Sequence, residues 1–192
     1  TWSACVDTAS AESLPAEASA YTGNGDDGVY LNGTAISASA TWEDLGVPYV
    51  VSDTVDVGGT AGEPAVLTLS AGTVVQFERD RGLRFSRTGA ASALHVDGTS
   101  EAPVELSARG ASSAGFWLGL DVSKGATDVV LSNVSILGAG GKEAALVVAD
   151  VPVFAEHLIV ERSETAGIRL EGTAAFAEGS TGLVIRECDL PL

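Results

Sequence analysis

Arginines are concentrated in one short segment of this chain, Arg79–Arg87. The segment holds four of the ten Lys and Arg residues of the protein, together with one aspartate. A planar guanidinium can bind a carboxylate through two parallel hydrogen bonds, so Arg81 and Arg84 are candidate ligands for an acidic sugar or another carboxylate. In the alternative interpretation, the arginines pair with Glu78, Asp80 and acids of neighbouring strands, and only stabilise the fold.

Trp117 and Asp121 lie in Gly115–Val122, where apolar residues alternate with other types. If the segment is a strand, this period of two turns Trp117 and Asp121 out to solvent. The same period turns Phe116 and Leu118 inward. An exposed aromatic ring on a flat β face is suited to stacking on a sugar ring. The two outward residues are therefore candidate ligand-binding residues; alternatively, Trp117 packs beneath a loop or an adjoining domain.

A turn at Gly23–Gly28 carries three side chains with oxygen ligands. Asn24, Asp26 and Asp27 offer the donor type that Ca²⁺ prefers, next to glycines that allow a tight loop. The full EF-hand pattern and the glycine–aspartate nonapeptide repeat are both missing. The alternative is a plain turn in which an Asp or Asn side chain bonds to the backbone. No other cofactor is predicted.

His95 and Asp97 are two residues apart in an alternating segment, and a strand would place both on its outward face. Such a pair can act as a general base and the group that orients it. No serine or cysteine nucleophile motif accompanies the pair. We therefore interpret it as a solvated surface pair and predict no catalytic residue.

The acidic composition excludes several functions. The chain has 192 residues with 26 Asp and Glu against 10 Lys and Arg, which gives a formal net charge of −16. Phosphate backbones and anionic membranes both require a cationic face, so neither nucleic acid nor an anionic membrane is an expected partner. No apolar run approaches the roughly 20 residues that span a bilayer, so no transmembrane segment is predicted.

The two cysteines, Cys5 and Cys188, stand near opposite ends of the sequence. Neither has the local spacing of a zinc or redox motif. In an exported protein they can form one disulfide, which in an elongated fold requires the N-terminal segment to run back along the body. The alternative is two unpaired thiols.

Short strands separated by turns dominate the sequence from Val29 onward. Leu67–Phe77 alternates apolar with small or polar residues, contains a glycine turn, and is followed by a further short run at Gly82–Phe85. Similar runs recur to the end of the chain, and no long amphipathic helix is visible. The pattern predicts an all-β protein.

Related runs recur at intervals of about two dozen residues. One series contains the segments that begin at Gly119, Ala145 and Gly167, and the other contains those that begin at Leu131, Ala155 and Thr181. This period is typical of one coil of a β-solenoid, in which each coil satisfies the backbone groups of its neighbours. Within the coils, we expect residues such as Leu94 to point inward.

Two regions are predicted. Residues 1–28 are rich in Ala, Ser, Thr and Gly and are expected to form an irregular N-terminal cap or tether. Residues 29–192 are expected to form a β-helix domain of five or six coils, which continues beyond this chain if Leu190–Leu192 does not fold over the last coil.

The order of several segments resembles that of a known group of proteins. TWEDLGVPYVVSDTVDV at Thr41 is followed by LTLSAGTVVQF, GLRF, ALHVDGTSEAPVELSA, a W-x-G segment and VVLSNVSILGAGG. This order resembles that of bacterial exported surface proteins and lipoproteins with a right-handed parallel β-helix of the pectin-lyase-like fold. The resemblance covers residues 41–192 and implies a secreted or cell-surface location.

The resemblance leaves the activity open, because one solenoid supports lyases, hydrolases, adhesins and scaffolds. The motifs of the hydrolytic members, N-x-D, D-D, G-H-G and R-x-K, are absent from residues 41–192, which the resemblance covers. The leading expectation is a non-enzymatic surface module for adhesion, matrix or carbohydrate interaction, with a surface glycan or a protein as partner. The alternative is a polysaccharide lyase or glycoside hydrolase of the same fold.

Overall fold

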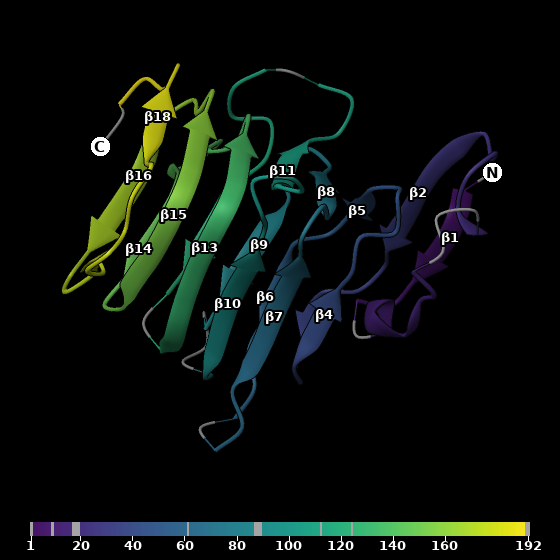
Figure 1. Ribbon diagram of the computed structural model, residues 1–192, viewed down its shortest axis with the longest axis horizontal. Helices are drawn as coiled ribbons and strands as arrows, with labels where there is room; N and C mark the ends of the chain where they lie inside the picture. Colours follow the sequence, from purple (N-terminus) through teal and green to yellow (C-terminus); the bar gives the residue numbers. More distant parts are fainter. Residues whose placement is uncertain are drawn as a thin grey trace.

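The computed structural model describes residues 2–8, 10–16, 20–60, 62–86, 90–111, 113–123 and 125–190. The chain winds through successive coils whose strands stack in parallel along the long axis of the molecule (Figure 1). Every pairing between strands in the described residues is parallel, and the strands fall into a 12-stranded and a 6-stranded sheet. The predicted all-β fold is confirmed as a parallel β-helix.

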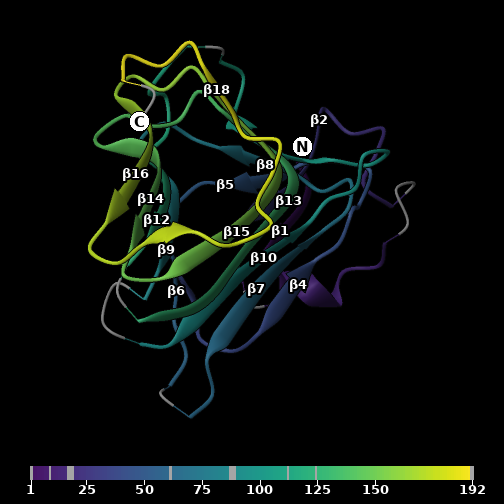
Figure 2. The ribbon, with the colours of Figure 1, turned by 60° about the vertical axis from the view of Figure 1, so that its left-hand side comes forward.

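Three faces surround the core, and the chain visits them in the same order in each coil (Figure 2). The first face contains β4 (Ala40–Trp42), β7 (Ala65–Ser70), β10 (Ser92–Asp97) and β17 (Ala175–Phe176). The second contains β1 (Trp2–Val6), β2 (Asp26–Leu31), β5 (Tyr49–Val51), β8 (Val74–Phe77), β11 (Val104–Ala108) and β18 (Val184–Arg186). The third contains β3 (Ala35–Ile36), β6 (Val55–Val57), β9 (Gly82–Phe85), β12 (Gly119–Val122), β14 (Ala144–Ala149) and β16 (Ala166–Glu171).

Two long strands, β13 (Ala126–Leu137) and β15 (Pro152–Glu161), run through both the first and the second face. Each bends at a residue with left-handed backbone, Asn133 with φ +46° and His157 with φ +51°. The Asn133 side chain donates a hydrogen bond to the carbonyl of Gly98 on the preceding coil, at 3.2 Å. These bends turn the strands around a corner without breaking the pairing, which joins the two faces into one sheet.

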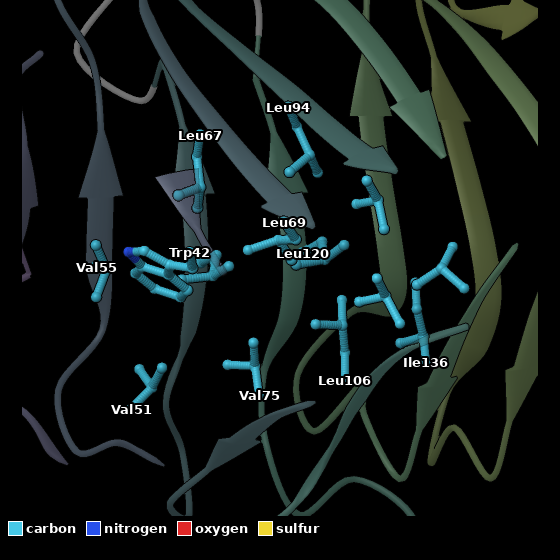
Figure 3. Packing of buried hydrophobic residues seen from close by; sticks show 14 of the residues in the cluster. Trp42, Val51, Val55, Leu67, Leu69, Val75, Leu94, Leu106, Leu120 and Ile136 are labelled. Carbon is cyan, nitrogen blue, oxygen red and sulfur yellow. The ribbon is translucent and has the colours of Figure 1, made fainter. Parts of the chain in front are cut away.

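The core is built by strands whose side chains point alternately inward and outward. In β7, the side chains alternate between buried and half-buried along the strand, and Leu67 and Leu69 are fully buried. Leu94 is buried in β10 while its neighbour His95 is half-exposed. Figure 3 shows Leu67, Leu69 and Leu94 pointing into the same interior as Trp42, which comes from an earlier coil. The predicted inward and outward positions are therefore confirmed in these strands.

The length of the coils varies, whereas the sequence pattern predicted a nearly constant period of about two dozen residues. Val148 and its register partner Leu170 are 22 residues apart, whereas Phe85 and Val122 are 37 residues apart. Part of the difference is an excursion of ten residues, 109–118, between β11 and β12, compared with four residues, 162–165, between β15 and β16 in the shorter coil. Because this excursion is outside the strands, the period of two does not hold within it.

The N-terminal segment is more regular than its composition suggests. β1 pairs in parallel with β2, and β2 begins at Asp26, so the predicted boundary after residue 28 falls inside a strand. A 3-10 turn, η1 (Ala11–Ser13), packs against β4, and both Ala11 and Tyr21 are buried. The buried hydroxyl of Thr8 donates to the carbonyl of Ala35. The segment covers this end of the core.

Within the ranges given above, no helix has the length and apolar character needed to cross a membrane.

Candidate functional site

A pocket of about 180 Å³ opens on the outward side of the third face. It is bounded by β9, β12, β14 and the turn that precedes β14. Four charged side chains line it: Arg84, Asp121, Lys142 and Glu143. The pocket is smaller than the ~300–1,000 Å³ typical of sites for drug-sized ligands, so its size suits a single sugar or amino-acid unit.

Two stacked glycines form part of the floor of the pocket. Gly82 and Gly119 are register partners in β9 and β12, and Gly119 has φ +103°. A Cβ atom on Gly82 would lie 2.6 Å from the carbonyl oxygen of Gly119, and one on Gly119 would lie 2.4 Å from that of Ala145. Only glycine is compatible with this approach of the coils.

The stacking of coils places Arg84 beside Asp121. These residues are direct register partners on adjacent strands of the third face, and Asp121 is in turn the partner of Val147. Register partners on neighbouring strands are about 5 Å apart, although 37 positions separate Arg84 from Asp121 in the sequence. Two of the four predicted ligand-binding residues are therefore brought together.

The two carboxylates of the pocket already accept hydrogen bonds. Asp121 Oδ1 accepts one from the Ser123 hydroxyl at 3.0 Å. Glu143 Oε2 accepts one from Arg169 Nη2 at 2.8 Å, and the Nε of the same arginine lies 2.8 Å from Glu171 Oε1. These contacts hold the acidic side chains at the rim.

The two cations of the pocket have no such partner. Within the part of the chain that the structure describes, neither Arg84 nor Lys142 forms an ion pair or a side-chain hydrogen bond. Arg84 is half-buried and Lys142 is exposed. The pocket therefore presents hydrogen-bond donors with positive charge beside two fixed acceptors, in a molecule that is otherwise strongly acidic.

Trp117 does not face solvent, so the predicted outward position is wrong. Its side chain is fully buried, and Nε1 donates to the carbonyl of Leu137 at 2.9 Å. The alternation failed here because Phe116–Leu118 precede β12 and are not in a strand. The buried ring has no free face for a sugar. It belongs to the hydrophobic core, so its burial agrees with a packing role, although the stated alternative was packing beneath a loop or an adjoining domain.

Two other arginines of the predicted cluster, Arg79 and Arg81, do not line the pocket. Arg81 Nε donates to the carbonyl of Ser52 at 2.9 Å and lies 3.9 Å from Asp53 Oδ1, on the preceding coil. Arg79 stacks over the ring of Phe116, with Cζ 4.6 Å from the ring centroid. Arg87 lies outside the described residues. Among the described arginines of the cluster, Arg84 is the one that lines the pocket.

The predicted calcium ligands point to different partners. The Asp27 carboxylate accepts from the backbone N–H of Asn24 at 2.7 Å and of Gly23 at 3.1 Å, which is the turn that was the alternative interpretation. Asp26 Oδ2 instead accepts from Arg109 Nη2 at 2.5 Å. Across the described ranges, no group of three or more His, Cys, Asp or Glu side chains is placed to hold a metal ion.

His95 pairs across strands rather than within its own strand. Its Nε2 lies 3.1 Å from Asp128 Oδ2 of β13 on the next coil, and no contact joins it to Asp97 in the described structure. Both partners are partly exposed. The pair is a surface contact between coils, consistent with the solvated interpretation.

Cys5 and Cys188 are both free thiols. Cys5 is in β1 and Cys188 follows β18, so they lie at opposite ends of the stack (Figure 1). The disulfide within one molecule is therefore not formed, because the N-terminal segment covers its own end instead of running back along the body.

Lys142 and Glu143 were missed because no motif surrounds them in the sequence. They follow the glycines of the turn at Gly138–Gly141 and immediately precede β14. An alignment of β14 with β9 and β12 would place Lys142 and Glu143, which precede β14, near Arg84 and Asp121. That alignment requires the coil lengths, which the sequence pattern gives only approximately.

No protein-family model, curated protein or solved structure matches this chain, so the fold and the pocket geometry are the findings from which its function has to be argued.

Proposed function

We propose that the protein is a non-enzymatic module of the cell surface or the extracellular space that binds glycans carrying carboxylate groups. The observation that carries the proposal is the pair of unpartnered cations, Arg84 and Lys142, beside the glycine floor of the pocket. A sugar carboxylate would accept hydrogen bonds from these two side chains. Asp121 and Glu143 would accept hydrogen bonds from hydroxyl groups of the same sugar unit.

The rigid stack supports a role in binding. Each inner coil is held by the coils on both sides of it, so strands position Arg84 and Asp121, and the short turn before β14 positions Lys142 and Glu143. A preformed site loses little conformational entropy when a ligand binds. The acidic charge of the rest of the molecule would disfavour anionic ligands elsewhere, which would direct a carboxylate to this pocket.

The test is a panel of neutral and acidic polysaccharides, with and without calcium, in which retention and cleavage products are measured together. We expect retention by a polyuronate, no retention by neutral glycans and no cleavage.

Replacing Arg84 or Lys142 by alanine should weaken retention by about tenfold or more, because each removes a charge-assisted hydrogen bond worth roughly 1.5–3 kcal/mol. Arg79→Gln removes the same charge outside the pocket and should leave retention unchanged.

A second candidate function is a polysaccharide lyase or glycoside hydrolase. It is favoured by one observation, that Asp121 and Glu143 border the same pocket as Arg84 and come from adjacent coils. The ion pair between Glu143 and Arg169 argues against Glu143 as a base, because the cation holds the carboxylate. Unsaturated or newly reducing sugar ends in the assay above, lost in Asp121→Asn, would establish the enzyme. Neither retention nor cleavage would point to a protein partner or a structural rod.

A further inference from the structure

A row of charged side chains runs along the outward side of the third face. Asp56 in β6, Arg84 in β9 and Asp121 in β12 are direct register partners on three successive coils. Asp56 is exposed, and Arg84 and Asp121 are half-buried. The sign of the charge therefore alternates from coil to coil, at the ~5 Å spacing of neighbouring strands.

The two members of this row that line the pocket are not paired with each other. Opposite charges directly across neighbouring strands are close enough to form an ion pair. In the described structure, however, no ion pair joins Arg84 to Asp121, and neither forms one with another residue. Both charges are therefore available to a ligand in the pocket that they line.

Asp121 differs from the other carboxylate of the pocket. Glu143 is ion-paired with Arg169 at 2.8 Å. Asp121 accepts one hydrogen bond at Oδ1, from the neutral hydroxyl of Ser123, and within the described residues its Oδ2 has no hydrogen-bond partner. A sugar hydroxyl would bond to this carboxylate but leave its charge unbalanced, whereas an ammonium group would both bond to it and balance its charge.

Apolar side chains border these charges. Val147, the register partner of Asp121 on the following coil, lines the pocket with 6 % of its surface exposed. Leu118, which is half-buried, lines the same pocket. The pocket therefore offers an apolar surface for the C–H groups of a sugar ring beside charges of both signs.

The charge of the whole protein favours the same kind of ligand. With a formal net charge of −16, the protein repels a polymer whose only charged groups are carboxylates, and each further sugar unit near the surface adds to the repulsion. A polymer in which an ammonium group accompanies each carboxylate has no net charge and is not repelled in this way.

We propose that the pocket binds a zwitterionic glycan, in which a carboxylate and an ammonium group lie on the same sugar unit or on adjacent units. Arg84 and Lys142 donate to the carboxylate, Asp121 accepts from the ammonium group, and the sugar ring packs on Val147. This inference rests on the proposed function, and it narrows the ligand from acidic glycans in general to those that also carry a free amino group.

The experiment compares two polymers with the same backbone. One alternates glucuronate with N-acetylglucosamine, and the other is the same polymer after chemical removal of the acetyl groups. Both are titrated by calorimetry at mildly acidic pH, where the free amines are protonated and the carboxylates are ionised. We expect the deacetylated polymer to bind about tenfold more tightly, which is the effect of one added charge-assisted hydrogen bond.

Asp121→Asn tests the residue that makes this difference. Asparagine keeps the shape of the side chain and an acceptor for Ser123, but it carries no charge. The variant should lose the preference for the deacetylated polymer. It should bind the acetylated polymer more tightly, because a negative charge beside the ligand carboxylate is removed. Asp97→Asn makes the same change at an exposed position on the first face and should keep the preference.

The outcomes separate this inference from the function on which it rests. Equal binding of the two polymers, lost in Arg84→Ala, would overturn the ammonium site and leave the carboxylate site unaffected. A preference that persists in Asp121→Asn would reflect general attraction to an acidic protein. Weaker binding of both polymers in that variant would mean that Asp121 only positions Arg84. Either result would overturn the inference, whereas no binding of either polymer would overturn the proposed function as well.

Discussion

The rings of Phe77 and Trp117 lie face to face, with centroids 4.0 Å apart and planes within 2° of parallel. Phe77 ends β8 on the second face, whereas Trp117 belongs to the excursion that leads into β12. Both side chains are fully buried. This stack, with the hydrogen bond from Trp117 Nε1 to Leu137, fixes the longest coil against the core and so supports the strand that carries Asp121.

Trp117→Ala should therefore destabilise the protein by about 3–5 kcal/mol, the range for removing a buried aromatic side chain. Urea unfolding monitored by circular dichroism measures the effect. Trp117→Phe retains the stack but loses the indole N–H, and should cost clearly less. If Trp117→Ala were as stable as the parent protein, the ring would not be part of the core.

Leu94 and His95 are adjacent in β10 but point to opposite sides of the strand. Leu94→Asp places an unpaired charge in the interior of the stack and should unfold the protein. His95→Asp introduces the same side chain on the outward side and should leave a folded protein, destabilised only slightly by the nearby Asp128. Far-ultraviolet circular dichroism distinguishes the two variants, and equal behaviour would contradict the assignment of inside and outside.

Asn133 adopts left-handed backbone at the corner of β13. A β-branched residue is strained in this conformation, so Asn133→Val should cost about 1–3 kcal/mol, in addition to the lost bond to Gly98. Asn133→Gly relieves the backbone and should cost less than the valine variant. Thermal unfolding of the two variants makes the comparison, and a valine variant as stable as the glycine variant would show that the corner relaxes.

Burial raises the pKa of Tyr49 well above its ordinary value, with smaller contributions from Tyr21, Glu43 and Asp44. The neutral hydroxyl donates to the carbonyl of Glu43 at 3.0 Å. Above the ordinary tyrosine pKa of about 10, the unfolded chain loses a proton that the folded protein retains. The free energy of unfolding should therefore be unaffected by this group below that pH and should fall by up to about 1.4 kcal/mol per pH unit above it.

Tyr49→Phe is the control for this alkaline loss of stability, which urea titrations at a series of pH values would measure. The variant lacks the ionisable hydroxyl, so its stability should fall less steeply above pH ~10, although its stability at neutral pH is lower by about one hydrogen bond. Parallel pH profiles for the variant and the parent protein would assign the alkaline transition to another group.

Arg109, which follows β11, connects successive coils along the second face. It contacts Asp26 and Glu78 and lies over the ring of Tyr30, with Cζ 4.6 Å from the centroid. Arg109→Met keeps the length of the side chain but removes these charge contacts, and should cost about 1–2 kcal/mol.

The expected readout for Arg109→Met is faster hydrogen exchange in β2, with a difference from the parent protein that shrinks as salt is added. Arg109→Lys retains the charge but not the planar fork, so it should restore only part of the protection. Unchanged exchange of β2 in the methionine variant would show that the strand is held by its neighbours alone.

The sequence by itself determined the strands and their faces. Side chains in a strand alternate with a period of two, so a local pattern such as that around Leu94 is sufficient to place its neighbours inside or outside. The outward position of Arg84 was predictable for the same reason.

Only the tertiary structure decided which outward residues meet. Arg84 and Asp121 become neighbours because a coil of a particular length separates them, and coil lengths vary with the excursions between strands. The burial of Trp117 depends on Phe77, 40 residues earlier, and no local period encodes that contact.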